Sequence, residues 1–354
     1  MKVCVINSLY PPYSRGGAEI VAQRDVIKHQ EAGDDVFVVT LGPWKGFKSF
    51  CHHLEKQDGI RIYRFYSLNI FSFIDINSKS FIARAVWHLI DLFNIHTYIC
   101  LRKILKQERP ELVLTHNLKG IGYTAWWAIQ SLHLKNTHTV HDVQLAEPSG
   151  AIRKGKERKH RLYSTICSSL IGSPTKIISP SRWLMDFYTD RGFFSESKKE
   201  INLAFGQLPL VQKLDLKPQT NKVKFIYASQ VETSRGIFTL IKALNSLSNK
   251  NWQLEIMNTG SALKRIKKLV GEDDRFVFTS DWQKEKIGES DFLILPSLVY
   301  ENSPTIIPIS LTLRTPVIAS NIGGIGEMMD DGVNGYLFEP GSSESLVKVL
   351  QKVI

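Results

Sequence analysis

Short apolar runs rich in β-branched residues recur along the chain, and stretches with apolar residues at helical spacing separate many of them. Each run is too short for a helix, and its nearly continuous apolar character is typical of a strand buried on both faces. Strands that alternate with helices form parallel sheets covered by helices. The expected strands are 1–7, 36–40, 60–65, 112–116, 137–141, 176–180, 223–229, 252–258, 275–279, 291–297 and 315–320. The expected helices include one that begins at Ala18 and others over 81–107, 120–133, 236–248, 261–269 and 304–313.

The alternation is interrupted once, where glycine and proline residues break regular structure, and it restarts after residue 220. A chain of 354 residues is also too long for one ordinary core. We therefore expect a first domain over 1–205, a linker over 206–221 and a second domain over 222–354. Each domain would be a doubly wound α/β lobe, and two such lobes facing a central cleft would bind ligands at the carboxyl ends of their strands.

Cysteine spacing and hydropathy limit the cellular setting. The four cysteines lie far apart without metal-type spacing, which indicates reduced thiols rather than disulfides. The six-residue apolar run at the amino end is too short for a signal-peptide core. The longest apolar stretch, 86–101, contains histidine and aspartate side chains, so it is not expected to span a membrane. These features are typical of a soluble intracellular protein.

The net charge of +11 is concentrated in the first part of the chain. Residues 1–205 contain 28 Lys and Arg against 18 Asp and Glu, giving +10, and the remainder contains 17 against 16, giving +1. One basic run comprises Arg153, Lys154, Lys156, Arg158, Lys159 and Arg161. It is either a solvated face or a surface for an anionic partner. Because the sequence lacks the aromatic-rich strands and zinc spacing of common nucleic-acid modules, an anionic membrane surface or a phosphorylated lipid is favoured over nucleic acid.

The loop after the first strand ends in two glycines, Gly16 and Gly17, directly before the expected helix. Glycine permits positive φ and lets backbone N–H groups approach a ligand without a Cβ in the way. A strand, a glycine loop and a helix in this order commonly seat a phosphate on the helix amino terminus. The alternative is a turn that needs glycine only for its own geometry.

Two histidines end expected strands of the first domain. His116 ends strand 112–116, and His141 ends strand 137–141 and is followed by Asp142. Carboxyl ends of strands are where doubly wound sheets bind ligands, so these side chains are candidates for a site. The alternative for each histidine is a core residue whose hydrogen bonds are satisfied.

A carboxylate follows a strand of the second domain. Glu301 lies in the loop after strand 291–297, with Ser303 as the expected N-cap and Pro304 as the expected first helical residue. A carboxylate beside the start of a helix could hold a sugar hydroxyl close to a phosphate. Alone, Glu301 could equally be a surface carboxylate. A second strand–glycine–helix arrangement follows at 320–327.

The chain resembles the retaining glycosyltransferases of family 4, which have the GT-B fold of two Rossmann-like lobes. The resemblance covers essentially the whole chain and depends on segments that occur in the family's order. They are YPPYSRGGAE at 10–19, PELVLTHNLKGIG at 110–122, HD at 141–142, ISPSRW at 178–183, SRGIFTLIKAL at 234–244, ENSPTIIP at 301–308 and TPVIASNIGGIGEMMDDGVNGYLF at 315–338.

The resemblance implies a site for a nucleotide-diphosphate sugar. Glu301 would bind the sugar hydroxyls and His141 would lie near the sugar, so these two are the expected catalytic residues. Arg235 stands where the family usually has a phosphate-binding lysine, and it still supplies a cation with bidentate reach. The expected donor-binding residues are Gly16, Gly17, Gln230, Arg235, Thr305, Ile306 and Glu327.

No metal and no cofactor are expected, because no Asp-x-Asp clamp appears in a convincing place. The charge of the diphosphate would be met by Arg235, by the helix start at Thr305 and by the amides of the glycine loop. Retaining transfer in this family is usually assigned to a front-face route, in which the leaving diphosphate helps to deprotonate the acceptor hydroxyl. We therefore expect no enzymatic nucleophile.

Two positions depart from the family pattern. The second glutamate, eight positions after the first, is replaced by Ile309, and the arginine five positions before the phosphate-binding cation is replaced by Gln230. Each lost charge-assisted hydrogen bond is worth roughly 1.5–3 kcal/mol, so donor binding is expected to be weaker than in relatives. The chain also stops at Ile354, where relatives usually continue into a further helix.

The expected function is transfer of a hexose to a glycan or a polyprenyl-diphosphate-linked acceptor in cell-surface polysaccharide biosynthesis. The basic run places the enzyme in the cytoplasm, peripherally associated with the inner face of an anionic membrane. Three alternatives remain open. A sugar-nucleotide 2-epimerase shares the two-lobed layout, a non-catalytic sugar or polyprenyl-phosphate binder would explain Ile309, and nucleic-acid binding would rest on charge alone.

Overall fold

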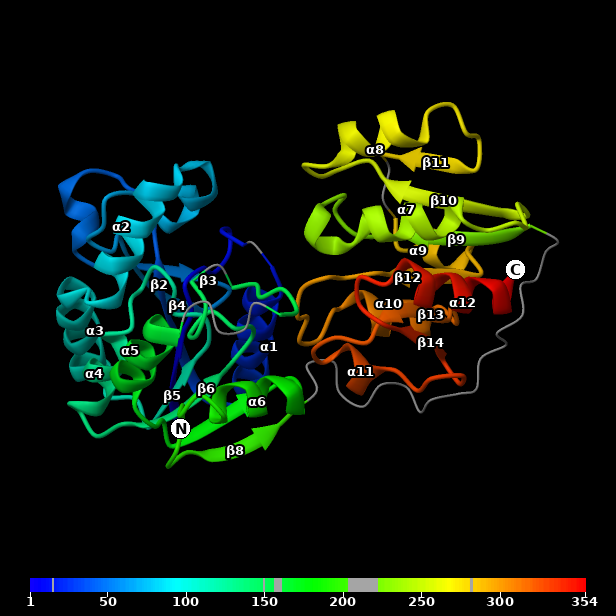
Figure 1. Ribbon diagram of the computed structural model, residues 1–354. Coiled ribbons are helices and arrows are strands. Elements are labelled where there is room, and N and C mark those ends of the chain that lie inside the picture. The colour runs from blue at the N-terminus through cyan, green and yellow to red at the C-terminus, as the bar shows by residue number, and fades with distance from the viewer. Residues whose placement is uncertain (15, 149, 156–160, 203–221, 281–282) are drawn as a thin grey trace. The chain divides into compact units, whose positions relative to one another are not determined.

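The computed structural model describes residues 1–14, 16–148, 150–155, 161–202, 222–280 and 283–354. These residues form two compact units, each built around one sheet (Figure 1). The first unit contains the described residues of Met1–Gly150, Arg158–Pro180 and Leu184–Asn202. Residues 151–155 and Ser181–Trp183, which lie inside the predicted first domain, group with the second unit. The predicted linker, 206–221, lies outside the described residues.

The sheet of the first unit has the strand order β3-β4-β2-β1-β5-β6-β7-β8, and every neighbouring pair is parallel except β3 with β4. Its strands are β1 (Lys2–Ile6), β2 (Asp35–Leu41), β3 (His53–Gln57), β4 (Ile60–Phe65), β5 (Leu112–Thr115), β6 (Lys135–Thr139), β7 (Lys176–Ser179) and β8 (Lys198–Ile201). The helices of this part of the chain are α1 (Gly17–Glu31), α2 (Phe81–Leu92), α3 (Ile95–Glu108), α4 (Ala125–Gln130), α5 (Arg161–Ile171) and α6 (Arg182–Thr189), with 3₁₀ turns η1 (Phe47–Phe50) and η2 (Phe73–Ser78).

The sheet of the second unit is parallel throughout, in the order β11-β10-β9-β12-β13-β14. Its strands are β9 (Val223–Tyr227), β10 (Trp252–Met257), β11 (Phe276–Thr279), β12 (Phe292–Leu295), β13 (Val317–Ser320) and β14 (Gly335–Phe338). Its helices are α7 (Ile237–Asn245), α8 (Leu263–Val270), α9 (Glu285–Gly288), α10 (Ile306–Thr312), α11 (Ile325–Met328) and α12 (Ser343–Val353), with the 3₁₀ turn η3 (Thr233–Arg235).

Both faces of the second sheet are buried, as the continuous apolar runs predict. Along β12, Phe292 and Ile294 belong to one apolar cluster, whereas Leu293 and Leu295 belong to another. Successive side chains of a strand point to opposite faces, so the two clusters cover the two sides of the sheet. The expected parallel α/β fold is therefore confirmed.

The single helix predicted over 81–107 is wrong, because α2 ends at Leu92 and α3 begins at Ile95. Asn94 separates them. Its side-chain Oδ1 accepts the N–H of Thr97 at 3.1 Å and so caps α3, while its Nδ2 donates to Ser67 Oγ at 2.8 Å. Asn94 is buried and its hydrogen bonds reach a distant segment of the chain, so the break depends on tertiary contacts as well as on capping.

The helix predicted over 120–133 is shorter, because α4 begins only at Ala125. Gly120 and Gly122 have φ of +91° and +96°, in a region that is incompatible with a right-handed helix. A Cβ on Gly120 would lie 2.8 Å from the Cβ of Phe73, so the loop packs too closely for another residue type. Three strands were not predicted. β3 and β8 have largely exposed polar residues and lack a continuous apolar run, and β14 is a four-residue strand that begins with a glycine.

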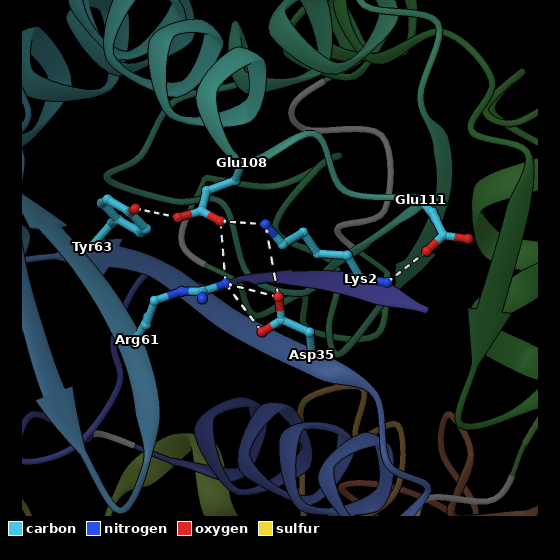
Figure 2. A network of polar contacts seen from close by, with 6 residues as sticks. All are labelled: Lys2, Asp35, Arg61, Tyr63, Glu108 and Glu111. Carbon is cyan, nitrogen blue, oxygen red and sulfur yellow. Dashed lines mark hydrogen bonds and ion pairs between the residues drawn. The ribbon is translucent and has the colours of Figure 1, made fainter.

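A network of charged side chains joins the amino ends of three strands to the end of α3 (Figure 2). Glu108 of α3 accepts hydrogen bonds from Lys2 Nζ at 2.8 Å, from Arg61 at 3.2 Å and from the hydroxyl of Tyr63. Arg61 also donates to both oxygens of Asp35 at 3.1 Å. Burial alone would raise the pKa of Glu108, but the hydrogen bonds from Lys2 and Tyr63 and the charge of Arg61 lower it below its ordinary value. The carboxylate therefore fixes α3 across β1, β2 and β4.

Replacing Glu108→Gln should lower the free energy of unfolding by about 1–3 kcal/mol near neutral pH, since three donors lose their charged acceptor. Because the folded-state pKa of Glu108 is depressed, its contribution is present above the ordinary glutamate pKa and is lost as the pH falls through the folded value. Urea unfolding at neutral and acidic pH measures this difference. Glu111→Gln is the control, because Glu111 is exposed and accepts the backbone N–H of Lys2. An equal loss in both variants, or a loss that persists in acid, would contradict the assignment.

Candidate functional site

Among the parallel strands of each sheet, the strand order changes direction at one point. It lies between β1 and β5 in the first unit and between β9 and β12 in the second. In doubly wound sheets, ligands bind beyond the carboxyl ends of the strands at such a point. The loops after these four strands carry Gly16 and Gly17, His116, Arg235, and Glu301, respectively.

In the second unit, Arg235 and Glu301 form an ion pair between Nη1 and Oε1. Arg235 ends η3, in the segment after β9, and Glu301 follows β12, so the pair joins the loops of two neighbouring strands. The hydroxyl of Ser297 donates to the same Oε1 of Glu301 at 3.1 Å. The carboxylate is largely buried and the guanidinium is about one third exposed, with side-chain exposures of 14% and 38%. A cation and a carboxylate therefore lie side by side at the edge where ligands of such sheets bind.

Glycines hold the loops around Glu301 in place by close backbone contacts. Gly236 follows Arg235 with φ of +74°, and a Cβ there would lie 1.7 Å from the carbonyl oxygen of Pro296. The N–H of Gly324 donates to the carbonyl of Glu301 at 2.7 Å, and a Cβ on Gly323 would lie 2.2 Å from that same oxygen. No side chain fits between these backbones, so the loops after β9, β12 and β13 fix the directions of Arg235 and Glu301.

The helix after Glu301 begins later than its sequence predicts. Ser303 was expected as the N-cap, but α10 begins at Ile306 with Thr305 as its N-cap residue. The N–H of Ile307 donates to the carbonyl of Pro304 at 3.1 Å, which makes a turn ahead of the regular helix. The first N–H groups of a helix have no acceptor within it, so the amides at Thr305 and Ile306 are suitable donors to an anion.

The other residues predicted for the second unit have different surroundings. Both oxygens of Glu327 accept backbone N–H groups, from Arg182 at 2.7 Å and from Trp183 at 2.6 Å, two residues that group with this unit. Gln230 is exposed, and its carbonyl accepts the hydroxyl of Tyr227 at 3.0 Å. Ile309 is half-buried and packs against the apolar cluster that includes Ile307. A nucleotide contact was predicted for Glu327, and in the structure its two carboxylate oxygens accept hydrogen bonds from backbone N–H groups of the protein.

In the first unit, the two glycines are not required by backbone conformation. Gly16 has φ of −172° and is the N-cap residue of α1, and its N–H donates to Glu19 Oε2 at 2.8 Å. A Cβ on Gly17 would meet no atom within 4 Å, and its φ is not positive. Neither glycine therefore uses the positive φ that glycine permits. Nothing among the described residues requires glycine at Gly17, which leaves the close approach of a ligand as a reason for it.

His116 and His141 lie together beyond β5 and β6, which are neighbouring strands. Nδ1 of His116 is 3.1 Å from Nε2 of His141, and the two rings stack with centroids 5.3 Å apart. Asp25 Oδ2 lies 3.4 Å from the other ring nitrogen of His116. Burial lowers the pKa of His141 to about 4 and, with the nearby His141 and His138, holds that of His116 well below its ordinary value. Both imidazoles are therefore neutral near neutral pH.

Asp142 is held by its own loop. Its Oδ1 accepts the N–H of Gln144 at 2.8 Å, and its carbonyl accepts the hydroxyl of Tyr188 at 2.6 Å. Burial raises the pKa of Asp142 to about 6, against the opposing effects of the Gln144 hydrogen bond and the Lys119 charge. A cavity of about 20 Å³ lies among Lys119, His141 and Asp142, which is room for about one water molecule.

The basic run is described only in part. Lys154 forms an ion pair with Glu339, Arg153 makes an isolated bridge with Val299, and Arg161 is exposed at the start of α5. Lys156, Arg158 and Lys159 lie outside the described residues. At least one member of the run therefore has an acidic partner within the protein.

Ser297 and Asp25 are not among the predicted residues. Ser297 lies four residues before Glu301 at the end of a strand, a position that could have suggested a role. Asp25 lies in the middle of α1, far from His116 in sequence, and no local pattern indicates the contact.

In the part of the chain that the structure describes, no group of three or more His, Cys, Asp or Glu side chains is placed to hold a metal ion. None of the described helices has the length and apolar character needed to cross a bilayer.

Comparison with known proteins assigns both halves of the chain. The family "Glycosyltransferase Family 4" matches residues 15–200, and the family "Glycosyl transferases group 1" matches residues 212–354. An uncharacterised 42.6 kDa protein in the cps region of Klebsiella pneumoniae is 23% identical over 96% of this chain and 90% of its own length. A putative teichuronic acid biosynthesis glycosyltransferase of Bacillus subtilis, TuaC, is 23% identical over 99% of this chain and 89% of its own length.

The fold is also that of known glycosyltransferase structures. The structure of HepE from Anabaena, solved in complex with UDP, matches 99% of this chain and 89% of its own length with a TM-score of 0.69 and 16% identity. The two parallel-sheet α/β units are therefore those of the GT-B fold, as the sequence predicts. On the family match and this fold together, the chain belongs to the family 4 glycosyltransferases.

Proposed function

We propose that this glycosyltransferase moves a hexose, with retention of anomeric configuration, from a nucleotide-diphosphate donor to a glycan or polyprenyl-diphosphate-linked acceptor. The observation that carries the proposal is the Arg235–Glu301 pair beside the switch point of the second sheet. A cation and a carboxylate side by side suit a ligand that joins a phosphate to a ring bearing hydroxyls. The descriptions of the two relatives, a cps region and teichuronic acid biosynthesis, support a role in assembling a cell-surface polysaccharide.

The donor would replace the contact between Arg235 and Glu301 by contacts of its own. The guanidinium of Arg235 binds phosphate oxygens in a bidentate manner, and the N–H groups at Thr305 and Ile306 bind further phosphate charge. Glu301 then accepts hydrogen bonds from sugar hydroxyls, while Ser297 continues to hold its Oε1. At Gly17 a ligand can approach the backbone at the start of α1 without a Cβ in the way.

Transfer would follow a front-face route. The bond between the anomeric carbon and the phosphate oxygen breaks on the face from which the acceptor oxygen attacks, and the acceptor proton passes to the leaving diphosphate. Arg235 stabilises the negative charge that develops on that diphosphate. His141, whose half-buried imidazole is neutral because its pKa is about 4, serves as a hydrogen-bonding group rather than a cation.

We also propose that the reaction needs no metal cofactor and takes place at the cytoplasmic face of a membrane. The guanidinium and the backbone amides replace a divalent cation in neutralising the diphosphate. The excess of +10 in residues 1–205 favours an acceptor held at an anionic surface. The second candidate is a non-catalytic binder of sugar nucleotides, because Ile309 and Gln230 replace the charged residues of the family pattern.

Incubation with UDP-, GDP- and ADP-sugars and a polyprenyl-diphosphate-linked monosaccharide tests the proposal. We expect release of one nucleotide that requires the acceptor, and no loss of rate when EDTA is present. Isomerised nucleotide sugar would instead indicate an epimerase, and binding without turnover of any donor would indicate the non-catalytic role. Activity abolished by EDTA and restored by Mg²⁺ or Mn²⁺ would contradict metal independence.

Glu301→Gln should lower kcat by at least about tenfold while changing KM less, since a carboxylate hydrogen bond that strengthens in the transition state is lost. The matched control is Glu255→Gln, because Glu255 of β10 also pairs with a cation, Lys286 Nζ at 2.7 Å, but in the middle of its strand. Steady-state kinetics and a melting curve on both variants separate a catalytic effect from a loss of stability. Near-normal turnover of Glu301→Gln would remove this side chain from the site.

Ile309→Glu should tighten binding of the matching nucleoside diphosphate by about tenfold, because a carboxylate there could accept hydrogen bonds from both ribose hydroxyls. Ile309 is half-buried, so some loss of stability accompanies the gain. Calorimetric titration with the ribonucleotide and with its 2′,3′-dideoxy analogue isolates the ribose contribution, and the gain should be absent for the analogue. Lower stability with unchanged affinity for both ligands would argue against a ribose pocket at this position.

A further inference from the structure

The helix α2 of the first unit buries polar groups and exposes apolar ones. Its inward face carries Trp87, which is 1% exposed, together with Asp91 and Leu92. The indole N–H of Trp87 donates to the carbonyl of Phe71 at 2.9 Å. Both carboxylate oxygens of Asp91 accept the N–H of Gly120, at 3.0 and 3.1 Å. These bonds fix the helix to two loops and set which of its faces points outward.

The outward face of α2 is apolar. Ile82, Val86, Leu89 and Phe93 follow one another at spacings of four, three and four residues, so they form one stripe along the helix and its C-cap. Phe81, at the first position of the helix, is exposed beside them. The exposed fractions of these five residues range from 43% for Val86 to 78% for Phe81.

Two further isoleucines are exposed at the start of the next helix. Only Phe93 and Asn94 separate α2 from α3 (Figure 1), and Ile95 and Ile99 at the start of α3 are 54% and 59% exposed. We call the exposed residues of both helices the outer apolar face: Phe81, Ile82, Val86, Leu89, Phe93, Ile95 and Ile99. A set of exposed apolar side chains on two successive helices is a candidate interaction surface.

Basic residues outnumber acidic ones in the segment that carries the outer apolar face, with exposed Asp75 just before it and Glu108 just after it. Between residues 76 and 107 the sequence contains basic residues at Lys79, Arg84, Arg102, Lys103 and Lys106. The only acidic residue in that range is Asp91, which is buried. On α3 the two exposed isoleucines are followed at helical spacing by Lys103 and Lys106, which are also exposed. Apolar side chains bordered by lysine and arginine are the composition of a surface that enters the interface of an anionic membrane.

We propose that the outer apolar face docks this protein onto an anionic lipid bilayer, with its apolar side chains inserted below the headgroups and the neighbouring basic residues paired with lipid phosphates. This inference rests on the proposed lipid-linked acceptor and names the surface that brings the enzyme to it. Membrane association was predicted from the basic run at 153–161, of which Lys154 pairs with Glu339, and the outer apolar face is a second surface for the same partner.

A largely aromatic groove, whose lining also includes Asp75, lies beside α2. It has a volume of about 640 Å³ and lies beyond the carboxyl ends of β2 and β4, where Trp44 and Tyr66 are among the residues that line it. Phe71, another lining residue, stacks on Trp87 with centroids 6.1 Å apart, so the groove and α2 share a wall. A groove of this lining could receive the lipid-proximal part of an acceptor from a bilayer held at α2.

The test is co-sedimentation with vesicles of phosphatidylcholine alone and with added phosphatidylglycerol. We expect wild-type protein to bind the anionic vesicles, more weakly but still measurably at high salt, because salt screens the charges and leaves apolar insertion intact. The double variant Ile82→Ser with Leu89→Ser should bind them at least about tenfold more weakly. The matched control is Ile20→Ser with Ile27→Ser, which removes two comparably exposed isoleucines from α1 of the same unit, and it should bind like wild type.

Further measurements separate this inference from the proposed function. Melting curves and nucleotide titration should be unchanged in the double variant, since neither residue touches the proposed donor site. Wild-type protein that binds nucleotide but ignores anionic vesicles would overturn the docking surface and leave sugar transfer standing. Vesicle binding that survives the double variant but is lost with Arg153→Ser and Arg161→Ser would assign it to the basic run. A wild-type dimer in sedimentation velocity that becomes monomeric in the double variant, without vesicle binding, would assign the face to a second copy of the chain.

Discussion

The close approach of backbone to backbone at the carboxyl ends of β9, β12 and β13 is the constraint on which the candidate site depends. Parallel strands deliver their loops to one edge of the sheet, where Gly236, Gly323 and Gly324 let them touch without side chains between them. Arg235 precedes the first of these glycines, and the carbonyl of Glu301 contacts the other two. The ion pair is therefore held from both ends by main-chain packing, which is the rigidity that electrostatic stabilisation of a leaving group requires.

The sequence was sufficient for the parts of the fold that local pattern controls. Continuous apolar runs predicted the central strands, because burial on both faces leaves no polar positions. Where the predicted helix boundaries were wrong, contacts between residues far apart in the sequence determine them. Asn94 separates two helices and caps the second one, and it also bonds to the distant Ser67. Gly120 has a positive φ and packs closely on Phe73, so it cannot join a helix. The edge strand β3 was missed because an exposed strand needs no apolar period.

The same division applies to the site. Arg235 and Glu301 could be predicted because each lies in a segment that resembles a family motif. The partners that position such residues could not be predicted from local sequence. Ser297 matters only because the loop after β12 turns back toward it, and Asp25 only because α1 places it against His116. His116 and His141 were visible as strand ends, but the stacking that makes them one group follows from the pairing of β5 with β6.

Hydrogen bonds to buried backbone groups also determine which face of α2 is exposed. A helix in a doubly wound unit ordinarily turns its apolar stripe inward, which would place Leu89 against the sheet and Asp91 in water. Here the loop at Gly120 presents an N–H that Asp91 accepts, and the loop at Phe71 presents a carbonyl that Trp87 satisfies. An unpaired buried polar group costs more than an exposed leucine, so these bonds favour the orientation in which Trp87, Asp91 and Leu92 are buried and Leu89 is exposed. The outer apolar face is thus a consequence of how the loops of the first unit are held. The docking proposed for this face would cover its isoleucine and leucine side chains, because a bilayer interface accepts apolar side chains and lysine together.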